Sequence, residues 1–141
     1  MSLDSLRKLR GQTVETLMME LSRIAQSLTR SEERYRRIEA EMQIDAEQYR
    51  QHMQRGLTIE ALLEWQARMD SQQAALRQVR IEIEEATFSW ERTNNLLVEA
   101  SQECKVLDRI LERREATKRA DSARQEQQTT DEAASRRYLL R

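Results

Sequence analysis

Proline is absent from this 141-residue sequence and glycine occurs only twice, so the residues that most often interrupt helices and strands are nearly missing. Aromatic residues make up 4% of the chain and hydrophobic residues 38%, which is below the roughly 45–50% of ordinary globular domains. A compact globular core is therefore not expected. With 35% charged residues, the chain is either disordered or a long helix, and the spacing of its apolar residues must decide.

Residues that carry chemistry are equally scarce. One cysteine and one histidine exclude an intramolecular disulfide and a typical zinc site, and a lone cysteine favours a reducing compartment. Two glycines cannot build a glycine-rich phosphate loop. The start, Met1-Ser2-Leu3-Asp4, lacks the apolar core of a signal peptide, and no run approaches the ~18 apolar residues of a membrane span. We expect a soluble cytoplasmic protein that is not an enzyme, binds no cofactor or metal, and does not insert into a membrane.

Apolar residues recur with heptad spacing in two long segments. Nine of twelve positions are apolar in the first seam and thirteen of fifteen in the second, which predicts two helices that pack as a coiled coil. The first seam is Val14, Leu17, Leu21, Ile24, Leu28, Ser31, Tyr35, Ile38, Met42, Asp45, Tyr49 and His52. The second seam is Leu62, Trp65, Met69, Gln72, Leu76, Val79, Ile83, Ala86, Trp90, Thr93, Leu97, Ala100, Cys104, Leu107 and Leu111.

A short link with helix-ending and helix-starting residues separates the seams. Gly56 can adopt the left-handed conformation that ends a helix, and Thr58 can cap the next helix through its hydroxyl. Leu57 and Leu62 occupy the two positions of a hydrophobic staple. The predicted helices are therefore about Leu3–Gln54 and about Thr58–Arg119, and the short link forces them antiparallel.

The pairing register follows from placing His52 opposite Leu62. Tyr49 then faces Trp65, and the two seams stay in phase from the link back to the N-terminus. Other predicted pairs are Met42 with Gln72, Asp45 with Met69, Ile38 with Leu76, Tyr35 with Val79, Leu28 with Ala86, Leu21 with Thr93, Leu17 with Leu97 and Leu3 with Leu111. The fold class is all-α: a long antiparallel two-helix coiled-coil hairpin with an extended C-terminal helix.

Beyond Leu111 the seam fails, because charged residues occupy its next positions. Residues 112–141 hold eight basic and six acidic residues and end in apolar Tyr138, Leu139 and Leu140. We expect two parts, a hairpin of residues 1–111 with its hinge at 54–58, and a charged helical extension of residues 112–141 that is loosely ordered by itself. Arg113, Arg114, Arg136 and Arg137 are the basic candidates for partner contacts, and a merely solvated face is the alternative.

A second candidate surface lies on the outermost face of the second helix. Ala67, Ala74, Ile81 and Phe88 recur every seven residues there, where no intramolecular partner can cover them. We call Ile81 and Phe88 the outer stripe. It is either incidental surface apolarity or a docking site for another protein.

The chain resembles the FliJ proteins of the bacterial flagellar export apparatus and their injectisome relatives, the YscO proteins. The resemblance covers the whole chain in architecture and is clearest in its second half. The residues that carry it are Gly56-Leu57-Thr58 at the hinge, Trp65-Gln66, Ser89-Trp90, Leu111-Glu112-Arg113, and the tail Gln127-Gln128-Thr129-Thr130-Asp131-Glu132-Ala133-Ala134-Ser135-Arg136-Arg137.

The resemblance implies a coiled-coil stalk of type III secretion, peripheral to the inner-membrane apparatus, that binds three kinds of protein. It binds the hexameric export ATPase through the two chain ends, here Leu3, Leu6, Arg113, Arg114, Arg136, Arg137, Tyr138 and Leu139. It binds the cytoplasmic domain of the membrane export gate through residues after the hinge, here Trp65, Arg68, Gln72, Ala75 and Val79. Secretion chaperones are the third kind of partner.

Two alternatives to a secretion stalk come from the composition. An unrelated structural coiled-coil tether fits the seams, although it has no need of the Asp131-Glu132 and Arg136-Arg137 tail. Nucleic-acid binding is disfavoured because the net charge is −1 and acidic residues are interleaved with the arginines, whereas phosphate binding requires a stripe of one sign. The sequence leaves open a flagellar or an injectisome system, and a monomer or a dimer.

Overall fold

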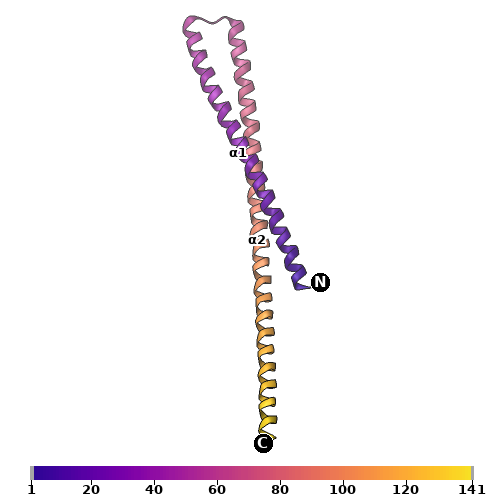
Figure 1. The fold of residues 1–141 in the computed structure, drawn as a ribbon. Coiled ribbons are helices and arrows are strands. Elements are labelled where there is room, and N and C mark those ends of the chain that lie inside the picture. Colours follow the sequence, from indigo (N-terminus) through magenta and orange to yellow (C-terminus); the bar gives the residue numbers. More distant parts are fainter. Residues whose placement is uncertain (1, 141) are drawn as a thin grey trace. The chain divides into compact units, whose positions relative to one another are not determined.

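The computed structural model describes residues 2–140, and these form two helices joined by a short link. Helix α1 spans Leu3–Arg55 and helix α2 spans Ile59–Leu139 (Figure 1). No strand occurs among the described residues. The all-α helical hairpin predicted from the seams is confirmed, and its long uninterrupted helices follow from the absence of proline.

Capping groups lie at the start of α1 and at both ends of the link, where the sequence predicts Gly56 and Thr58. The Ser5 amide donates to Ser2 Oγ at 3.2 Å at the start of α1. Gly56 has φ = +94° and its amide donates to the Met53 carbonyl, so it ends α1 in the left-handed region. The Ala61 amide donates to Thr58 Oγ1 at 3.1 Å, which makes Thr58 the N-cap of α2.

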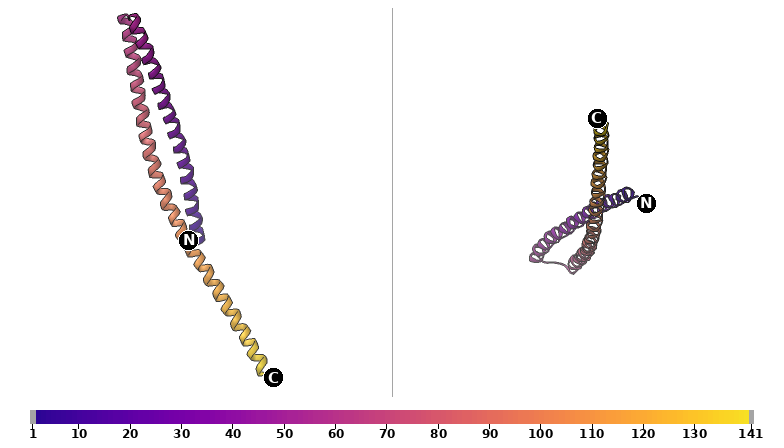
Figure 2. Two further views of the ribbon diagram at one scale, coloured as in Figure 1. Left: turned by 90° about the vertical axis from the view of Figure 1, so that its left-hand side faces the viewer. Right: turned by 90° about the horizontal axis from the view of Figure 1, so that it is seen from below.

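The predicted end of the second helix is wrong. Helix α2 continues to Leu139 instead of ending near Arg119, because no glycine or proline follows Gly56 and the tail is rich in alanine, glutamine, glutamate and arginine, which are good helix formers. In the views of Figures 1 and 2, the C-terminal end of α2 is a helix without a neighbouring helix. The division into residues 1–111 and 112–141 stays a prediction.

The described residues fall into two units. One unit comprises residues 16–97, which include the link, and the other comprises residues 2–15 together with 98–140. In each unit an α1 segment packs antiparallel against an α2 segment. The best buried seam residues of the first unit are Val79, Asp45 and Thr93, and those of the second are Ala100, Cys104 and Leu107.

Burial supports the seams, with three exceptions. Every residue of the first seam is buried or half-buried except His52, which is exposed. In the second seam Met69 is 43% exposed and Trp90 37% exposed, so these two large side chains remain partly at the surface. A two-stranded coil covers each seam residue from one side only, and the widest side chains therefore keep contact with water.

Candidate partner-binding surfaces

Trp65, the first candidate for gate contact, lies against aromatic residues of the facing helix. Its ring meets the Tyr49 ring edge to face, with centroids 5.8 Å apart, and the His52 ring lies 6.0 Å away. Edge-to-face packing is a favourable aromatic geometry. The predicted opposition of Tyr49 and Trp65 is confirmed.

Arg68 extends across the helix interface to a buried carboxylate. Its Nε atom lies 2.9 Å from Asp45 Oδ2, and its guanidinium carbon is 5.8 Å from the centre of the Trp65 ring. Asp45 is only 5% exposed, whereas the Arg68 side chain is 59% exposed. A buried carboxylate is costly unless it is paired and hydrogen-bonded, and here it attracts Arg68 from the facing helix.

Gln72 is the second donor to that carboxylate, because its Nε2 atom donates a hydrogen bond to Asp45 Oδ2. The predicted position of Asp45 opposite Met69 stays a prediction, and its carboxylate contacts Arg68 and Gln72 of α2. Trp65, Arg68 and Gln72 therefore form one cluster around Asp45, which we call the Asp45 cluster.

The other two gate candidates lie deeper in the hairpin. Ala75 is half-buried, and Val79 has no exposed surface at all. The Val79 side chain cannot touch another protein while this part of the hairpin is closed. Beside it, Arg80 donates to the Tyr35 hydroxyl at 3.0 Å, and this hydrogen bond raises the pKa of Arg80.

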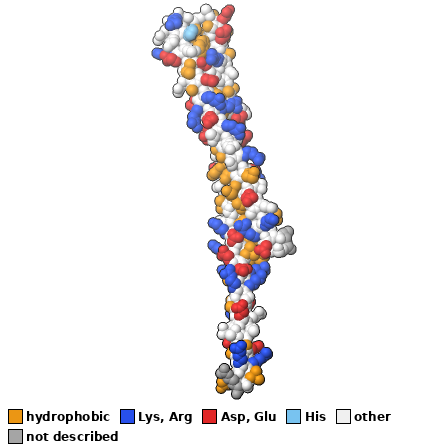
Figure 3. Space-filling view, in the orientation of Figure 1, with side chains coloured by type: hydrophobic (Ala, Val, Ile, Leu, Met, Phe, Trp, Pro, Cys, Tyr) orange, Lys and Arg blue, Asp and Glu red, His pale blue; other side chains and the backbone are white. Residues whose placement is uncertain are grey.

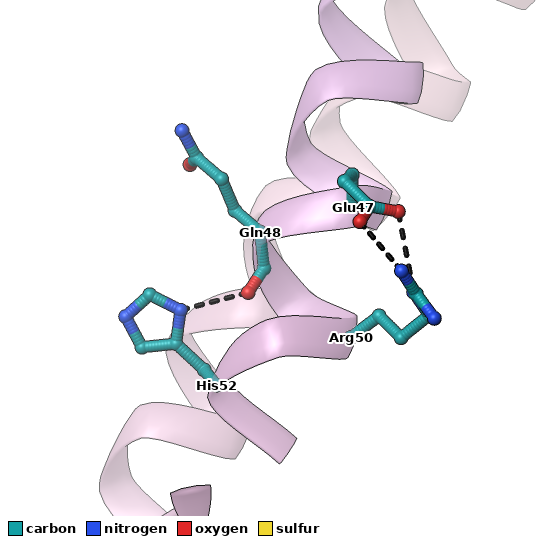
Figure 4. A network of polar contacts seen from close by, with 4 residues as sticks. All are labelled: Glu47, Gln48, Arg50 and His52. Atoms are coloured by element: carbon teal, nitrogen blue, oxygen red, sulfur yellow. Dashed lines mark hydrogen bonds and ion pairs between the residues drawn. The ribbon is translucent and has the colours of Figure 1, made fainter. Parts of the chain in front are cut away.

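The hinge end of α1 holds a local polar network (Figure 4). Arg50 donates to both carboxylate oxygens of Glu47, at 2.7 and 3.2 Å, and these hydrogen bonds lower the pKa of Glu47. His52 Nδ1 donates to the Gln48 carbonyl at 2.7 Å. His52 thus adds a side-chain donor to a backbone carbonyl of its own helix, one turn before the end of α1.

The N-terminal candidates for ATPase contact pack against α2 in the second unit. Leu3 and Leu6 are half-buried. Arg7 beside them binds both oxygens of Asp108, at 2.6 and 3.4 Å, and the hydrogen bond raises the pKa of Arg7. Arg10 pairs with Glu103 at 3.1 Å. These interhelical ion pairs hold residues 3–10 against residues 103–108.

The C-terminal candidates have no covering structure. All side chains of residues 112–140 are exposed, and those of Tyr138 and Leu139 are 81% and 82% exposed. Among the described residues, none forms an ion pair with Arg113, Arg114, Arg136 or Arg137. The extension therefore presents free guanidinium groups and an apolar end.

The outer stripe is also uncovered. Phe88 is 67% exposed and Ile81 is 47% exposed, and Ala67 and Ala74 are exposed on the same face. The face of the molecule in Figure 3 shows acidic and basic side chains interspersed, with apolar side chains among them. It shows no broad area of one sign that would suit a phosphate backbone.

The sequence interpretation missed the interhelical polar pairs. Arg7–Asp108, Arg10–Glu103, Arg34–Glu82 and Asp45–Arg68 all join residues of α1 and α2. Each lies within a position or two of a pair in the predicted register, so a search of those flanking positions for opposite charges could have found them. Arg68 also lies one turn after Glu64 on its own helix but pairs with Asp45. Ion pairs at i,i+4 spacing do form between Glu32 and Arg36 and between Glu115 and Arg119, at 3.7 and 3.9 Å.

Two other kinds of feature are absent from residues 2–140. No group of three or more histidine, cysteine, aspartate or glutamate side chains is placed to hold a metal ion. Neither helix contains a stretch long and apolar enough to cross a membrane. Cys104 is a free thiol buried in the seam.

Comparison with known proteins identifies the family. Neither the curated proteins nor the solved structures contain a match to this sequence. The model of the flagellar FliJ protein family matches residues 1–141, the whole chain. This match agrees with the hinge, tryptophan and tail motifs and with the helical hairpin. The chain therefore belongs to the FliJ family, whose members are cytoplasmic components of the flagellar type III protein-export apparatus.

Proposed function

We propose that this chain is a stalk and adaptor of the export apparatus that binds the hexameric export ATPase through its chain ends. The observation that carries the proposal is the extension of α2, in which residues 112–139 are helical and the side chains of residues 112–140 are exposed. A helix of this length is roughly 40 Å long. An unrelated structural tether is set aside by the family membership, and a tether would not need an unpaired, charged helix with an apolar end.

The chemistry of the extension suits insertion into a protein ring. Burial of a large apolar side chain such as Tyr138 or Leu139 contributes about 1.5–3 kcal/mol. Arg113, Arg114, Arg136 and Arg137 can each donate several hydrogen bonds to carboxylates of a partner. Because the extension is already helical, less conformational entropy is lost on binding than for a disordered tail.

Removal of residues 112–141 tests the ATPase contact. We expect the truncated chain to retain the thermal transition of the hairpin, because no seam residue is lost, and to stop stimulating the cognate export ATPase. A double variant, Tyr138→Glu with Leu139→Glu, should weaken stimulation strongly. Its matched control is Ala133→Glu with Ala134→Glu, which adds the same charge nearby without removing a large apolar side chain. Full stimulation by the truncated chain would exclude the extension as the contact.

We propose that the exposed part of the Asp45 cluster binds the cytoplasmic domain of the export gate. Trp65 and Arg68 support this assignment because they combine a partly exposed indole with an oriented cation, and both are common in protein interfaces. Val79, which is fully buried further along α2, stabilises the hairpin and is not part of this contact surface. Trp65→Ala and Arg68→Ala should each weaken binding of the gate domain in calorimetry, and Glu60→Ala is the control on the same helix. Such binding would place the chain at the periphery of the inner-membrane apparatus.

We assign the third kind of partner, the secretion chaperones, to the outer stripe. Ile81 and Phe88 form an exposed apolar surface that neither the seam nor the chain ends use. Ile81→Glu with Phe88→Glu should abolish chaperone capture and leave the melting temperature almost unchanged. Retained chaperone binding would make the stripe incidental surface, and a large drop in melting temperature would show that these residues stabilise the fold.

A further inference from the structure

Asp45 is a charged residue at a seam position where apolar residues predominate. It is 5% exposed, and two donors from α2 converge on its Oδ2 atom, Gln72 Nε2 and Arg68 Nε. No buried side-chain nitrogen or oxygen among the described residues lacks a hydrogen-bond partner. The desolvation cost of the carboxylate is thus offset by paired contacts, but an apolar pair at this level would stabilise the coil at least as well.

The usual use of a polar seam residue, the selection of register, is not needed here. A polar residue in the seam can fix the register between two separate helices. In this chain α1 ends at Arg55 and α2 begins at Ile59, so the short link already fixes how the two segments are paired near the hinge. Another role for the buried carboxylate is therefore indicated.

The contacts of Asp45 point to control of the neighbouring surface. Arg68 and Gln72 are long, flexible side chains on α2, and both are fastened at their tips to one carboxylate on α1. Arg68 is also placed over the Trp65 ring, so the carboxylate sets how much of the indole is covered. An immobilised arginine has already lost the side-chain entropy that binding would otherwise remove.

We infer that Asp45 is a positioning residue for the gate-contact surface. It holds Arg68 over Trp65 and fixes Gln72, and it thereby prepares a contact surface on α2. Asp45 itself is buried and does not touch the partner. The inference rests on the proposed gate contact for its functional meaning, whereas the positioning of Arg68 can be measured without any partner.

The test compares binding with stability in the full chain, using Asp45→Leu. Leucine suits a seam position, so the melting temperature should stay the same or rise. Affinity for the purified cytoplasmic domain of the cognate export gate should fall about tenfold, because two long side chains must then be ordered on binding. Arg68→Ala should cause a similar loss, and the double variant should lose little more than either single variant, since both act through one contact.

A matched control and a partner-free measurement separate the possible outcomes. Thr93→Val changes the other buried polar residue of the same unit and should leave gate affinity unchanged. In the NMR spectrum of the free protein, the Arg68 Nε–H signal should be resolved and slow to exchange, and Asp45→Leu should return it to the averaged arginine position.

An unaltered Arg68 signal in Asp45→Leu would overturn the inference. The inference would also be overturned if Arg68→Ala weakened gate binding while Asp45→Leu bound the gate domain with unchanged affinity. If Arg68→Ala and Trp65→Ala both bind the gate domain normally, the proposed gate contact fails. Loss of the Arg68 signal in Asp45→Leu would then still support the positioning role.

Discussion

Residues 16–97 and residues 112–140 are both almost entirely helical, but they differ in pairing and in burial. The first region pairs two helical segments along a seam and buries Val79, Thr93 and Asp45. The second is one helical segment in which every described side chain is exposed. The helical conformation of the extension thus agrees with its good local propensity and its lack of helix breakers, whereas pairing requires the seam as well. The part without a seam remains available to other proteins.

The largest expected effect comes from a charge placed in the seam. Val79 is fully buried, so Val79→Asp should destabilise the hairpin by about 4 kcal/mol or more, because an unpaired carboxylate would be buried. Ala123→Asp makes the same kind of change in the extension and should leave the main unfolding transition in place. Urea unfolding followed by circular dichroism checks both. Equal losses from the two variants would mean that the extension is packed in solution.

The next largest effect is a gain in stability from a disulfide bond between the two paired helices. Cysteines at Ile38 and Leu76, in a Cys104→Ser background, should form a disulfide within one chain. Closing a loop of roughly 40 residues should stabilise the hairpin by about 2–4 kcal/mol. Mass spectrometry and non-reducing electrophoresis at low protein concentration measure the product. If only intermolecular disulfides form, the chain is a dimer of exchanged or parallel helices and the hairpin is wrong.

A smaller effect is expected from glycine in the unpaired helix. Ala120→Gly together with Ala123→Gly should lower helix content locally, because each glycine costs about 1 kcal/mol relative to alanine in a helix interior. The unfolding midpoint of the paired seam should not move, since no seam contact changes. Amide hydrogen exchange of residues 112–140 is the direct measurement. A shift of the seam midpoint would contradict the independence of the two regions.

The smallest effect concerns the ion pair of Glu47 and Arg50. Hydrogen bonds from Arg50 lower the pKa of Glu47 in the folded chain, so the pair stabilises the fold above the ordinary pKa of a glutamate, about 4.3. That contribution is lost as the pH falls through the lowered value. Glu47→Gln should therefore have a slightly lower melting temperature than the unaltered chain at pH 7, and the difference in melting temperature should vanish under strongly acidic conditions. A difference that persists there would have another cause than the ion pair.

The arrangement of the hairpin was predictable because each step has a local physical cause. Gly56 and Thr58 mark the link, and the seam spacing places Tyr49 opposite Trp65. A helical extension beyond Leu111 was predicted, but the ordered part of α2 was expected to end near Arg119, because the absence of a seam was taken to loosen the tail, whereas α2 continues to Leu139. Seam spacing predicts where helices pair, and propensity predicts where they continue, so the two signals must be interpreted separately.

The candidate surfaces were predictable only in part. The exposure of Phe88 and Tyr138 follows from their positions outside the seam. The Asp45 cluster did not follow, because heptad spacing specifies which backbone positions face each other and gives no direction for long side chains. Arg68 had an acceptable partner in Glu64 on its own helix and instead binds a buried carboxylate on the other, where desolvation strengthens the attraction.

The backbone conformation of Gly56 determines whether an L- or a D-amino acid fits at the hinge. Its φ of +94° disfavours L-residues, yet a Cβ atom added there would meet nothing within 4 Å. The obstacle to a side chain is therefore chirality alone, and the mirror-image amino acid has its own preferred conformation in that region. A semisynthetic chain with D-alanine at position 56 should fold as before. It should also gain about 0.4–1 kcal/mol, because the unfolded chain then has fewer conformations to lose.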